Sequence, residues 1–568
     1  MWWKWGQWSI RRRFARLHSS HAEAPSTNQT DHFEETKQIY TAKLRDCTNS
    51  RSLPQARRLH AEISSIGLIR DHFVANLVIH MYGRCGDIAS AREIFDSMPR
   101  RNRFSWSIMI GAYAQTGHGR DALELFQRMG REGVRPSSVT FVVLLSVCAD
   151  LGGAALGEGR AIHAKIIADG LAADPILCNN LVNMYGKCGS LRDAKEIFES
   201  FSSGRDVVAW TAMIQAYAQL GHSAAALELF WAMVEAGEAR PNRVTFITAL
   251  GACSNLHDLE EGRKIHRYID RYEEEERSDV LVATALINMY GKCGSVEDAR
   301  EIFQGIPKRD VIAWNAIIAA NAQLGHGKEA LELLQRMDLE GVRPNQVSFV
   351  SALDGCASIG ALAEGRSIHA RVRASRSLAS TTLGNTLIHM YGKCGSLAGA
   401  RVAFEEMGGA AAPRDAVSWA ALVAAYARHG LSRAAREVFE RMAWEGVQPS
   451  GVAFVSILAA CSHGGLLLPS RSYFLAMSGD HGIAPSMEHY GCVIDLLGRL
   501  GMMEELMDLI AAMPFEPGGI EWRNVLGACR TQSDVENGSD AAEIARELEP
   551  EHAAAYVMLF GLYSTEEP

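Results

Sequence analysis

Three unrelated sequence markers return along this chain with one shared spacing of about 103 residues. The string Tyr-Gly-x-Cys-Gly, in which x is Lys or Arg, begins at Tyr82, Tyr185, Tyr290 and Tyr391. A histidine after Arg-x-Ile or Arg-x-Leu and a tryptophan after Ser or Ala keep nearly the same spacing, at His60, His163, His266 and His369 and at Trp106, Trp210, Trp314 and Trp419. Independent globular domains do not produce such a grid, so the sequence predicts a repeat protein.

Each 103-residue period divides into three repeat units of about 31–37 residues, which is enough for two helices and two turns. In one of them Trp106, Met109, Ile110 and Tyr113 fall at i, i+3, i+4 and i+7, which is one face of an α-helix. A unit of this size cannot bury its apolar face alone. Stacked units therefore predict an all-α, right-handed α-solenoid superhelix of helix-turn-helix repeats, with a concave groove lined by the first helices.

The sequence also marks where these helices stop and start. Gly189 and its counterparts tolerate a positive φ and predict the end of a first helix. Ser190 with Asp193 and Ser295 with Asp298 predict capping boxes at the start of the second helices.

Charge separates the first residues from the rest of the chain. The formal net charge is −9, yet residues 1–22 hold five basic residues and no acid, which leaves −14 for the remainder. An acidic body argues against tight, sequence-blind binding of phosphates. The basic leader, residues 1–36, is typical of an organellar transit peptide, and we expect a mitochondrial destination, with the chloroplast or a plain disordered tail as alternatives.

The chain shows no catalytic constellation. His21-Ala22-Glu23 and His60-Ala61-Glu62 match half of a zinc deaminase motif, but no Cys-x-x-Cys is present to complete it, and His60 lies on the repeat grid, which favours a packing role. There is no P-loop and no Gly-x-Ser-x-Gly. We expect no enzyme activity, no metal and no cofactor. The longest apolar run, 553–563, is too short to span a membrane, so we expect no membrane partner.

The repeat units resemble those of the pentatricopeptide repeat family, in its plant organellar PLS branch. Residues 311–318 and 340–345 resemble a P unit, 286–294 an S unit, and 347–353 with 364–370 an L unit. The resemblance implies fourteen repeats in L-S-P order over residues 37–518. The tetratricopeptide repeat shares the unit length and the Ala-x-x-x-Phe string, but its Trp-x-x-Leu-Gly-x-x-Tyr opening is missing here.

The last residues resemble the C-terminal extension of RNA-editing members of the family. Residues 519–553 are similar to the first E-type extension motif, and residues 554–568 to an incomplete second motif. The DYW deaminase domain that ends many relatives is not found in this sequence.

In the family, two residues of each unit face an RNA base: the fifth, on the first helix, and the last. Carried over by register, the resemblance implies the pairs Asn76/Asn102, Ser107/Ser137, Asn179/Asp206, Thr211/Asn242, Thr284/Asp310, Asn315/Asn345, Asn385/Asp415 and Ala420/Ser450. The L units place an apolar residue at the fifth position, namely Val142, Ile247, Val350 and Val455. Polar side chains can hydrogen-bond a base edge, whereas apolar ones only stack on it. The alternative is that the polar residues are helix caps.

The family's recognition code then implies the RNA sequence Y-?-?-U-A-?-G-Y-?-U, read from the second unit. The resemblance predicts sequence-specific binding of single-stranded organellar RNA as a site-recognition factor for C-to-U editing, with a DYW-type deaminase or other editing factors supplied in trans. The alternatives are RNA stabilisation, processing or splicing without an editing role, and a protein-binding scaffold of tetratricopeptide type.

Overall fold

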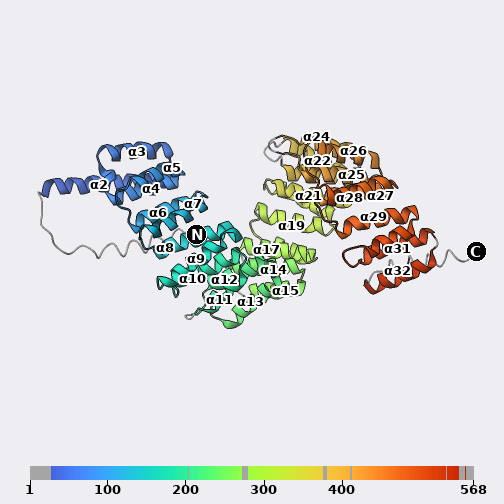
Figure 1. Cartoon of the computed structure of the whole chain (residues 1–568), viewed down its shortest axis with the longest axis horizontal. Coiled ribbons are helices and arrows are strands. Elements are labelled where there is room, and N and C mark those ends of the chain that lie inside the picture. The colour runs from blue at the N-terminus through green and yellow to red at the C-terminus, as the bar shows by residue number, and fades with distance from the viewer. Residues whose placement is uncertain are drawn as a thin grey trace, which may run out of the picture. The chain divides into compact units, whose positions relative to one another are not determined.

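The computed structural model describes residues 27–201, 204–271, 279–374, 380–409, 412–532, 534–548 and 557. These residues form helices throughout, with no β-strand among them and one isolated bridge between Gly409 and Ala412. The chain divides into two compact bodies, residues 1–248 and 249–568. Their helices are labelled in Figure 1. The predicted all-α fold is confirmed.

The N-terminal body consists of successive helix pairs. Its first helices are α2 (Thr27–Ser50), α4 (His72–Cys85), α6 (Arg103–Gln115), α8 (Ser138–Leu151), α10 (Pro175–Lys187) and α12 (Val207–Gln219). Its second helices are α3 (Leu53–Ser65), α5 (Ile88–Ser97), α7 (Gly119–Arg131), α9 (Leu156–Ala168), α11 (Leu191–Glu199) and α13 (Ser223–Ala236). Short 3-10 turns, η2 (Leu68–Arg70) and η3 (Gly152–Ala155), complete it, and the boundary between the bodies falls inside α14 (Arg243–Leu256).

The C-terminal body continues the same pattern. Its first helices are α17 (Val280–Lys292), α19 (Val311–Gln323), α21 (Gln346–Ile359), α23 (Thr381–Lys393), α25 (Ala416–Arg428), α27 (Gly451–His463), α29 (Met487–Leu500) and α31 (Gly519–Gln532). Its second helices are α15 (Leu259–Ile269), α18 (Val296–Gly305), α20 (Gly327–Leu339), α22 (Leu362–Ala374), α24 (Leu397–Glu406), α26 (Ser432–Trp444), α28 (Leu467–Gly479), α30 (Met503–Ala511) and α32 (Val535–Leu548).

The three sequence markers meet where consecutive units pack. The phenylalanine of each Ala-x-x-x-Phe string lies edge-on against the next tryptophan, as in Phe198–Trp210 at 4.9 Å and Phe303–Trp314 at 4.7 Å between ring centroids. The grid histidine bonds the grid tyrosine, with His163 Nδ1 lying 2.9 Å from the Tyr185 hydroxyl. Edge-to-face pairs contribute about 0.5–1.5 kcal/mol beyond the burial of their area. The markers therefore form contacts between consecutive helices of the stack, which we call its joints. His60 Nδ1 lies 3.1 Å from the Tyr82 hydroxyl, so the packing role predicted for His60 is confirmed.

The glycine of each Tyr-Gly string lets two first helices approach closely. A Cβ placed on Gly186 of α10 would lie 2.5 Å from Ala216 Cβ of α12, closer than any real contact. The same approach recurs at Gly83, Gly291 and Gly392, each facing an alanine. Small residues at these crossings set the spacing of the layer that carries the candidate site.

Helix ends follow the prediction in part. Gly189 has a φ of 83° just past α10, as expected. The capping boxes predicted at Ser190 and Ser295 are wrong, because neither side chain bonds a backbone N–H. Instead Ser190 Oγ donates to Asp193 at 2.9 Å, and Asp193 also accepts from Arg160 of the preceding unit at 2.7 Å. The aspartate is used to join units rather than to cap a helix.

Two further expectations concern the two ends of the chain and a membrane-spanning segment. Residues 1–26 of the predicted leader and most of the predicted second extension motif lie outside the described residues. Helix α2 begins at Thr27, so residues 27–36 of the predicted leader are helical. Among the described residues, one stretch, 138–168, is long and apolar enough to span a membrane. It consists of α8 and α9, two helices separated by η3, and the apolar residues of α8 form repeat core.

Candidate nucleic-acid interface

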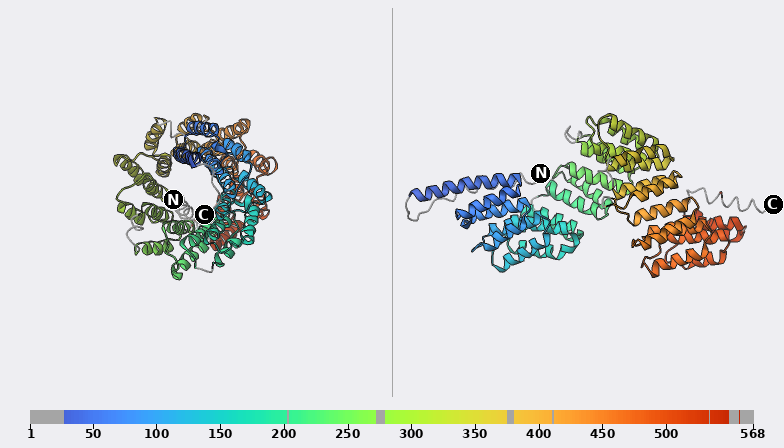
Figure 2. Two further views of the ribbon diagram at one scale, coloured as in Figure 1. Left: turned by 90° about the vertical axis from the view of Figure 1, so that its left-hand side faces the viewer. Right: turned by 90° about the horizontal axis from the view of Figure 1, so that it is seen from above.

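The first helices form a continuous layer in each body. In the N-terminal body α4, α6, α8, α10 and α12 each pack on the next, and in the C-terminal body α17, α19, α21, α23, α25, α27, α29 and α31 do the same. Second helices pack on the first helices of their own units, as α5 does on α4 and α18 on α17, and successive helix pairs can be followed in Figure 2. Within each body the first helices therefore carry the surface along which a ligand could contact one unit after another.

Every predicted fifth residue is the fifth residue of a first helix as the structure delimits it. Asn179 follows Pro175 at the start of α10, and Thr284 follows Val280 at the start of α17. The polar ones are largely buried, for example 7% exposed at Asn179 and 5% at Thr284. Their apolar counterparts in the L units, Val142, Ile247, Val350 and Val455, are half-buried.

Every predicted last residue caps the following first helix. Asp206 Oδ1 accepts the N–H of Ala209 at 2.8 Å, and Asn242 Oδ1 accepts that of Thr245 at 3.0 Å. The other members, which accept bonds in the same way, are Asn102, Ser137, Asp310, Asn345, Asp415 and Ser450. The cap interpretation thus holds for the last residues and fails for the fifth residues, which lie one turn inside the helix.

The structure brings three of the predicted pairs into direct contact. Asn179 Nδ2 donates to Asp206 at 3.0 Å, Asn315 Nδ2 to Asn345 Oδ1 at 3.1 Å, and Asn385 Nδ2 to Asp415 Oδ1 at 3.2 Å. These bonds leave one N–H of each fifth amide available.

Two further pairs are joined through a third hydroxyl. Thr211 and Asn242 both bond Thr245, at 2.8 and 3.1 Å, and Ser107 and Ser137 both bond Thr140, at 2.6 and 2.9 Å.

The remaining pairs differ. Thr284 donates to the Val280 carbonyl of its own helix at 2.7 Å, and the structure gives it no bond to Asp310. Asn76 Oδ1 is buried and has no partner among the described residues. Ala420 has no polar group, so the pair Ala420/Ser450 offers only one side chain to a ligand.

A groove of about 650 Å³ runs along the first helices of the N-terminal body. Four predicted residues line it, namely Val142, Asn179, Thr211 and Asn242. Its other lining residues from α6, α8, α10 and α12 are both apolar and amide-bearing, including Val208, Asn183 and Gln215. A mixed lining of this kind suits a planar, polar-edged ligand better than a purely apolar one.

A stripe of exposed apolar residues runs along the first helices and was not predicted from the sequence. The second residue of nearly every first helix is apolar and 40–68% exposed: Phe73, Phe104, Val139, Ile176, Val244, Leu281, Ile312, Val347, Val417, Val452 and Ile520. The second and fifth residues are i, i+3 neighbours on one helix face. Most polar fifth side chains therefore have an apolar platform beside them; the exception is Asn385, whose helix has Thr382 at the second position. The signal was visible in the sequence as an apolar residue outside the core stripe in most units.

In four units a basic side chain lies in the last turn of the first helix, on the same face. Arg84, Lys187, Lys292 and Lys393 are each the thirteenth and last-turn residue of their first helices. Eleven residues separate them from the exposed second residue, which returns to nearly the same angular position on a helix of 3.6 residues per turn. Lys187 lies 3.7 Å from Asp150 and is largely exposed. These residues supply positive charge along a chain whose net charge is negative.

No nucleophile or metal centre accompanies this surface among the residues the structure describes. Burial raises the pKa of Cys148, Cys253 and Cys356 to about 12, so these thiols stay protonated. The described ranges contain no group of three His, Cys, Asp or Glu residues that could hold a metal ion.

Family models match the repeats directly. The PPR repeat family matches residues 101–150, 205–255 and 309–358, and the pentatricopeptide repeat domain matches residues 404–463. The PPR repeat matches residues 73–103, 176–203, 282–311, 385–410 and 488–515. These matches set the tetratricopeptide alternative aside.

Relatives and solved structures agree. A pentatricopeptide repeat-containing protein of Arabidopsis thaliana named as chloroplastic is 35% identical over 93% of this chain, which spans 60% of that protein. One named as mitochondrial is 33% identical over 93% of this chain, which spans 75% of it. The crystal structure of the maize pentatricopeptide repeat protein PPR10 matches 93% of this chain and 81% of that chain with a TM-score of 0.60 at 20% identity, which confirms the solenoid fold. This chain belongs to the pentatricopeptide repeat family.

Proposed function

We propose that this chain binds single-stranded RNA in a plant organelle and reads it with about one base per repeat. The observation that carries the proposal is the recurring arrangement of a polar fifth residue, its hydrogen-bonded last residue and an exposed apolar second residue on one face of the first helices. PPR10 from maize, which has the same fold, is described in complex with an 18-nt psaJ RNA element. The relatives are named as chloroplastic and as mitochondrial proteins, and we retain mitochondrion as the proposed destination.

The three parts of the site suit three parts of a nucleotide. Unstacked bases lie against the apolar second residues, since every base has a stacking face. Fifth and last side chains hydrogen-bond the base edge. The basic residues at the ends of the S-unit first helices meet phosphates, which makes affinity salt-dependent. In the L units Val142, Ile247, Val350 and Val455 offer no hydrogen bond, so these units tolerate any base.

Binding to designed RNAs tests this proposal. The purified chain is titrated with a labelled RNA carrying Y-N-N-U-A-N-G-Y-N-U and with versions changed at the U, A or G positions. We expect each change to weaken binding, by about five- to thirtyfold for a lost edge contact of roughly 1–2 kcal/mol. Equal affinity for all the RNAs would exclude base reading.

The biological task proposed for this binding is site recognition in C-to-U editing. The proposal rests on the resemblance of 519–553 to an E-type extension, and these residues form a further helix pair, α31 and α32, packed on α29. The deaminase chemistry would come from a DYW-type partner or other editing factors in trans. Loss of one edited cytidine in a knockout plant would support this task. An intact editing profile with altered transcript ends or splicing would instead favour the stabilisation, processing or splicing alternative.

A further inference from the structure

A buried hydroxyl stands behind several of the proposed base-reading side chains. It belongs to the third residue of the next first helix. Ser348 Oγ donates to Asn315 Oδ1 at 2.5 Å, and Ser418 Oγ donates to Asn385 Oδ1 at 2.6 Å. Thr140 and Thr245 bond Ser107 and Thr211 in the same way, at 2.6 and 2.8 Å. All four hydroxyl-bearing residues are fully buried, so no ligand can contact them.

These bonds decide which polar group a fifth asparagine presents. The hydroxyl of Ser418 lies 2.6 Å from Asn385 Oδ1 and 2.9 Å from Asp415 Oδ1, the shorter contact being to Asn385, while Asn385 Nδ2 donates to Asp415 Oδ1 at 3.2 Å. An asparagine amide has one oxygen acceptor and two N–H donors. With the oxygen turned toward the hydroxyl and one N–H used, the second N–H is the donor that remains for the base. A rotation of the amide that presented the oxygen instead would break both bonds.

One pair of the same composition lacks this hydroxyl. Asn179 and Asp206 repeat the Asn385/Asp415 pair, but the third residue of α12 is Ala209 where α25 has Ser418. Asn179 Nδ2 still donates to Asp206, whereas Asn179 Oδ1 is buried with no hydrogen-bond partner among the described residues. A buried oxygen without a hydrogen bond is unfavourable, and its free energy falls when it turns toward a donor. The Asn179 amide is therefore held in place only through its Nδ2.

The hydroxyls follow the polarity of the residue they face. Hydroxyls at the third position, Ser105, Thr140, Thr245, Ser348 and Ser418, all come after a unit with a polar fifth residue. After the apolar fifth residues Val142, Ile247 and Val350 the third position is Leu177, Val282 and Leu383, and after Val455 it is His489, which has no hydroxyl. Two polar fifth residues, Asn179 and Thr284, are followed by alanines, Ala209 and Ala313. Ser105 makes a different contact from the other four: its hydroxyl bonds only the side-chain oxygen of the capping residue Asn102, at 3.2 Å. Capping alone does not explain this distribution, because every first helix needs a cap.

We propose that the buried hydroxyl at the third position of a first helix is a positioning residue for the preceding unit: it fixes the orientation of the fifth side chain and so sharpens base discrimination there. The inference rests on the proposed function, because it assigns a role within base reading. It predicts that recognition of one base depends on two adjacent units, and that Asn385/Asp415 discriminates more strongly than Asn179/Asp206.

The test exchanges the two sites in the full-length chain. Ser418→Ala should reduce the preference for U over C, A and G at the base assigned to Asn385/Asp415 by about three- to tenfold, the effect of one neutral hydrogen bond. Ser418→Thr keeps a hydroxyl that the sister positions 140 and 245 already accommodate, and it should retain the preference. Ala209→Ser should raise the preference for U at the base assigned to Asn179/Asp206. The preference at the base assigned to Asn315/Asn345 serves as the internal control and should not change.

The Asn385→Ala variant distinguishes failure of the positioning role from failure of the proposed base reading. If Asn385→Ala abolishes the U preference while Ser418→Ala and Ala209→Ser leave preferences unchanged, the positioning role is wrong and base reading stands. If Asn385→Ala itself leaves the preference unchanged, base reading at this unit is wrong and the positioning role falls with it. Equal loss of preference in Ser418→Ala and Ser418→Thr would also contradict a role for the hydroxyl. Helical circular dichroism and melting temperature confirm that each variant is folded.

Discussion

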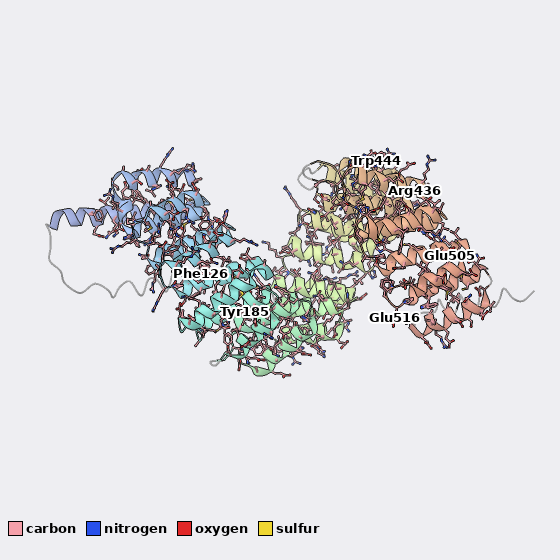
Figure 3. The ribbon with its side chains drawn as sticks, viewed as in Figure 1. Phe126, Tyr185, Arg436, Trp444, Glu505 and Glu516 are labelled. Carbon is pink, nitrogen blue, oxygen red and sulfur yellow. The ribbon has the colours of Figure 1, made fainter. Side chains whose placement is uncertain are left out.

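The first and second helices of each repeat differ in how much of their surface is buried. First helices are apolar on most sides: α19 buries nine of its thirteen residues, including Trp314, Asn315 and Asn321. Second helices such as α7 and α11 bury one stripe and expose charge. Their exposed sides are tied to neighbouring units by ion pairs, as in Arg128–Asp96 at 3.0 Å and Arg471–Glu505 at 3.1 Å. Glu505 is labelled in Figure 3.

This difference separates stability from recognition. Exposed ion pairs contribute little and are screened by salt, so the exposed faces of the second helices can vary with small effect. The first helices carry the core, the joints and the candidate site within a few residues of one another. A change there acts on packing or on RNA according to whether the side chain points into the stack or along the exposed second–fifth face.

Trp314→Ala should give the largest effect, because it removes the centre of a joint. Trp314 is fully buried and packs on Phe303. Truncation of a buried tryptophan costs about 3–5 kcal/mol. Hydrogen exchange should show lost protection in α18, α19 and α20 first, since repeats are coupled mainly to their neighbours. Unchanged protection in these helices would contradict the joint.

Ile312→Ser should affect RNA without affecting folding. Ile312 is 50% exposed beside Asn315, so stability should change by no more than about 0.5 kcal/mol. RNA affinity should fall by about three- to tenfold whichever base is offered, because stacking is insensitive to base identity. Leu339→Ser, at the exposed end of second helix α20, is the matched control and should leave affinity unchanged. Equal losses in the two variants would place RNA elsewhere.

Asn179→Ala should lower affinity only for RNA with U at the matched position, by about three- to tenfold. The reason is that alanine removes the available amide N–H and leaves the platform at Ile176 in place. Affinity measured with each of the four bases at that position would show this, and a uniform loss for all four would indicate a packing effect instead.

Acid should loosen the joints between second and first helices. Burial lowers the pKa of His60, His163 and His369 below its ordinary value of 6.5. The unfolded chain therefore binds more protons than the folded chain below about pH 6.5, and stability present above that pH is lost as the pH falls through this range. The melting temperature should drop between pH 7 and pH 5, with a shallower drop in His163→Asn. An identical slope in the two proteins would rule out this histidine as a source.

Arg471→Ala should have the smallest effect. Both partners of the Arg471–Glu505 pair are about half exposed, so stability should change by less than about 1 kcal/mol, and RNA affinity should be unchanged at moderate salt. A larger loss, measured by thermal unfolding, would mean that the second helices contribute more to the stack than their exposure indicates.

The sequence was informative wherever one residue type recurred on the grid. The period predicted the fold. The buried Trp106 and its relatives fix the helical phase, so the register could also predict which residues lie one turn inside each first helix and which precede it. The sequence could not show that Asp193 serves Arg160 rather than the helix start, since that choice depends on the neighbouring unit. The exposed second residues and the third-position hydroxyls were missed for a related reason: the meaning of each depends on what lies opposite it across a unit boundary.

The most direct test of base-by-base reading is a programmed change of specificity. RNAs selected from a random pool by the wild-type chain should share U-A-N-G-Y-N-U, and those selected by Thr284→Asn should carry U in place of G at the fourth position of that motif and be otherwise the same. An unchanged motif, or loss of the whole motif at once, would contradict the assignment of one unit to one base.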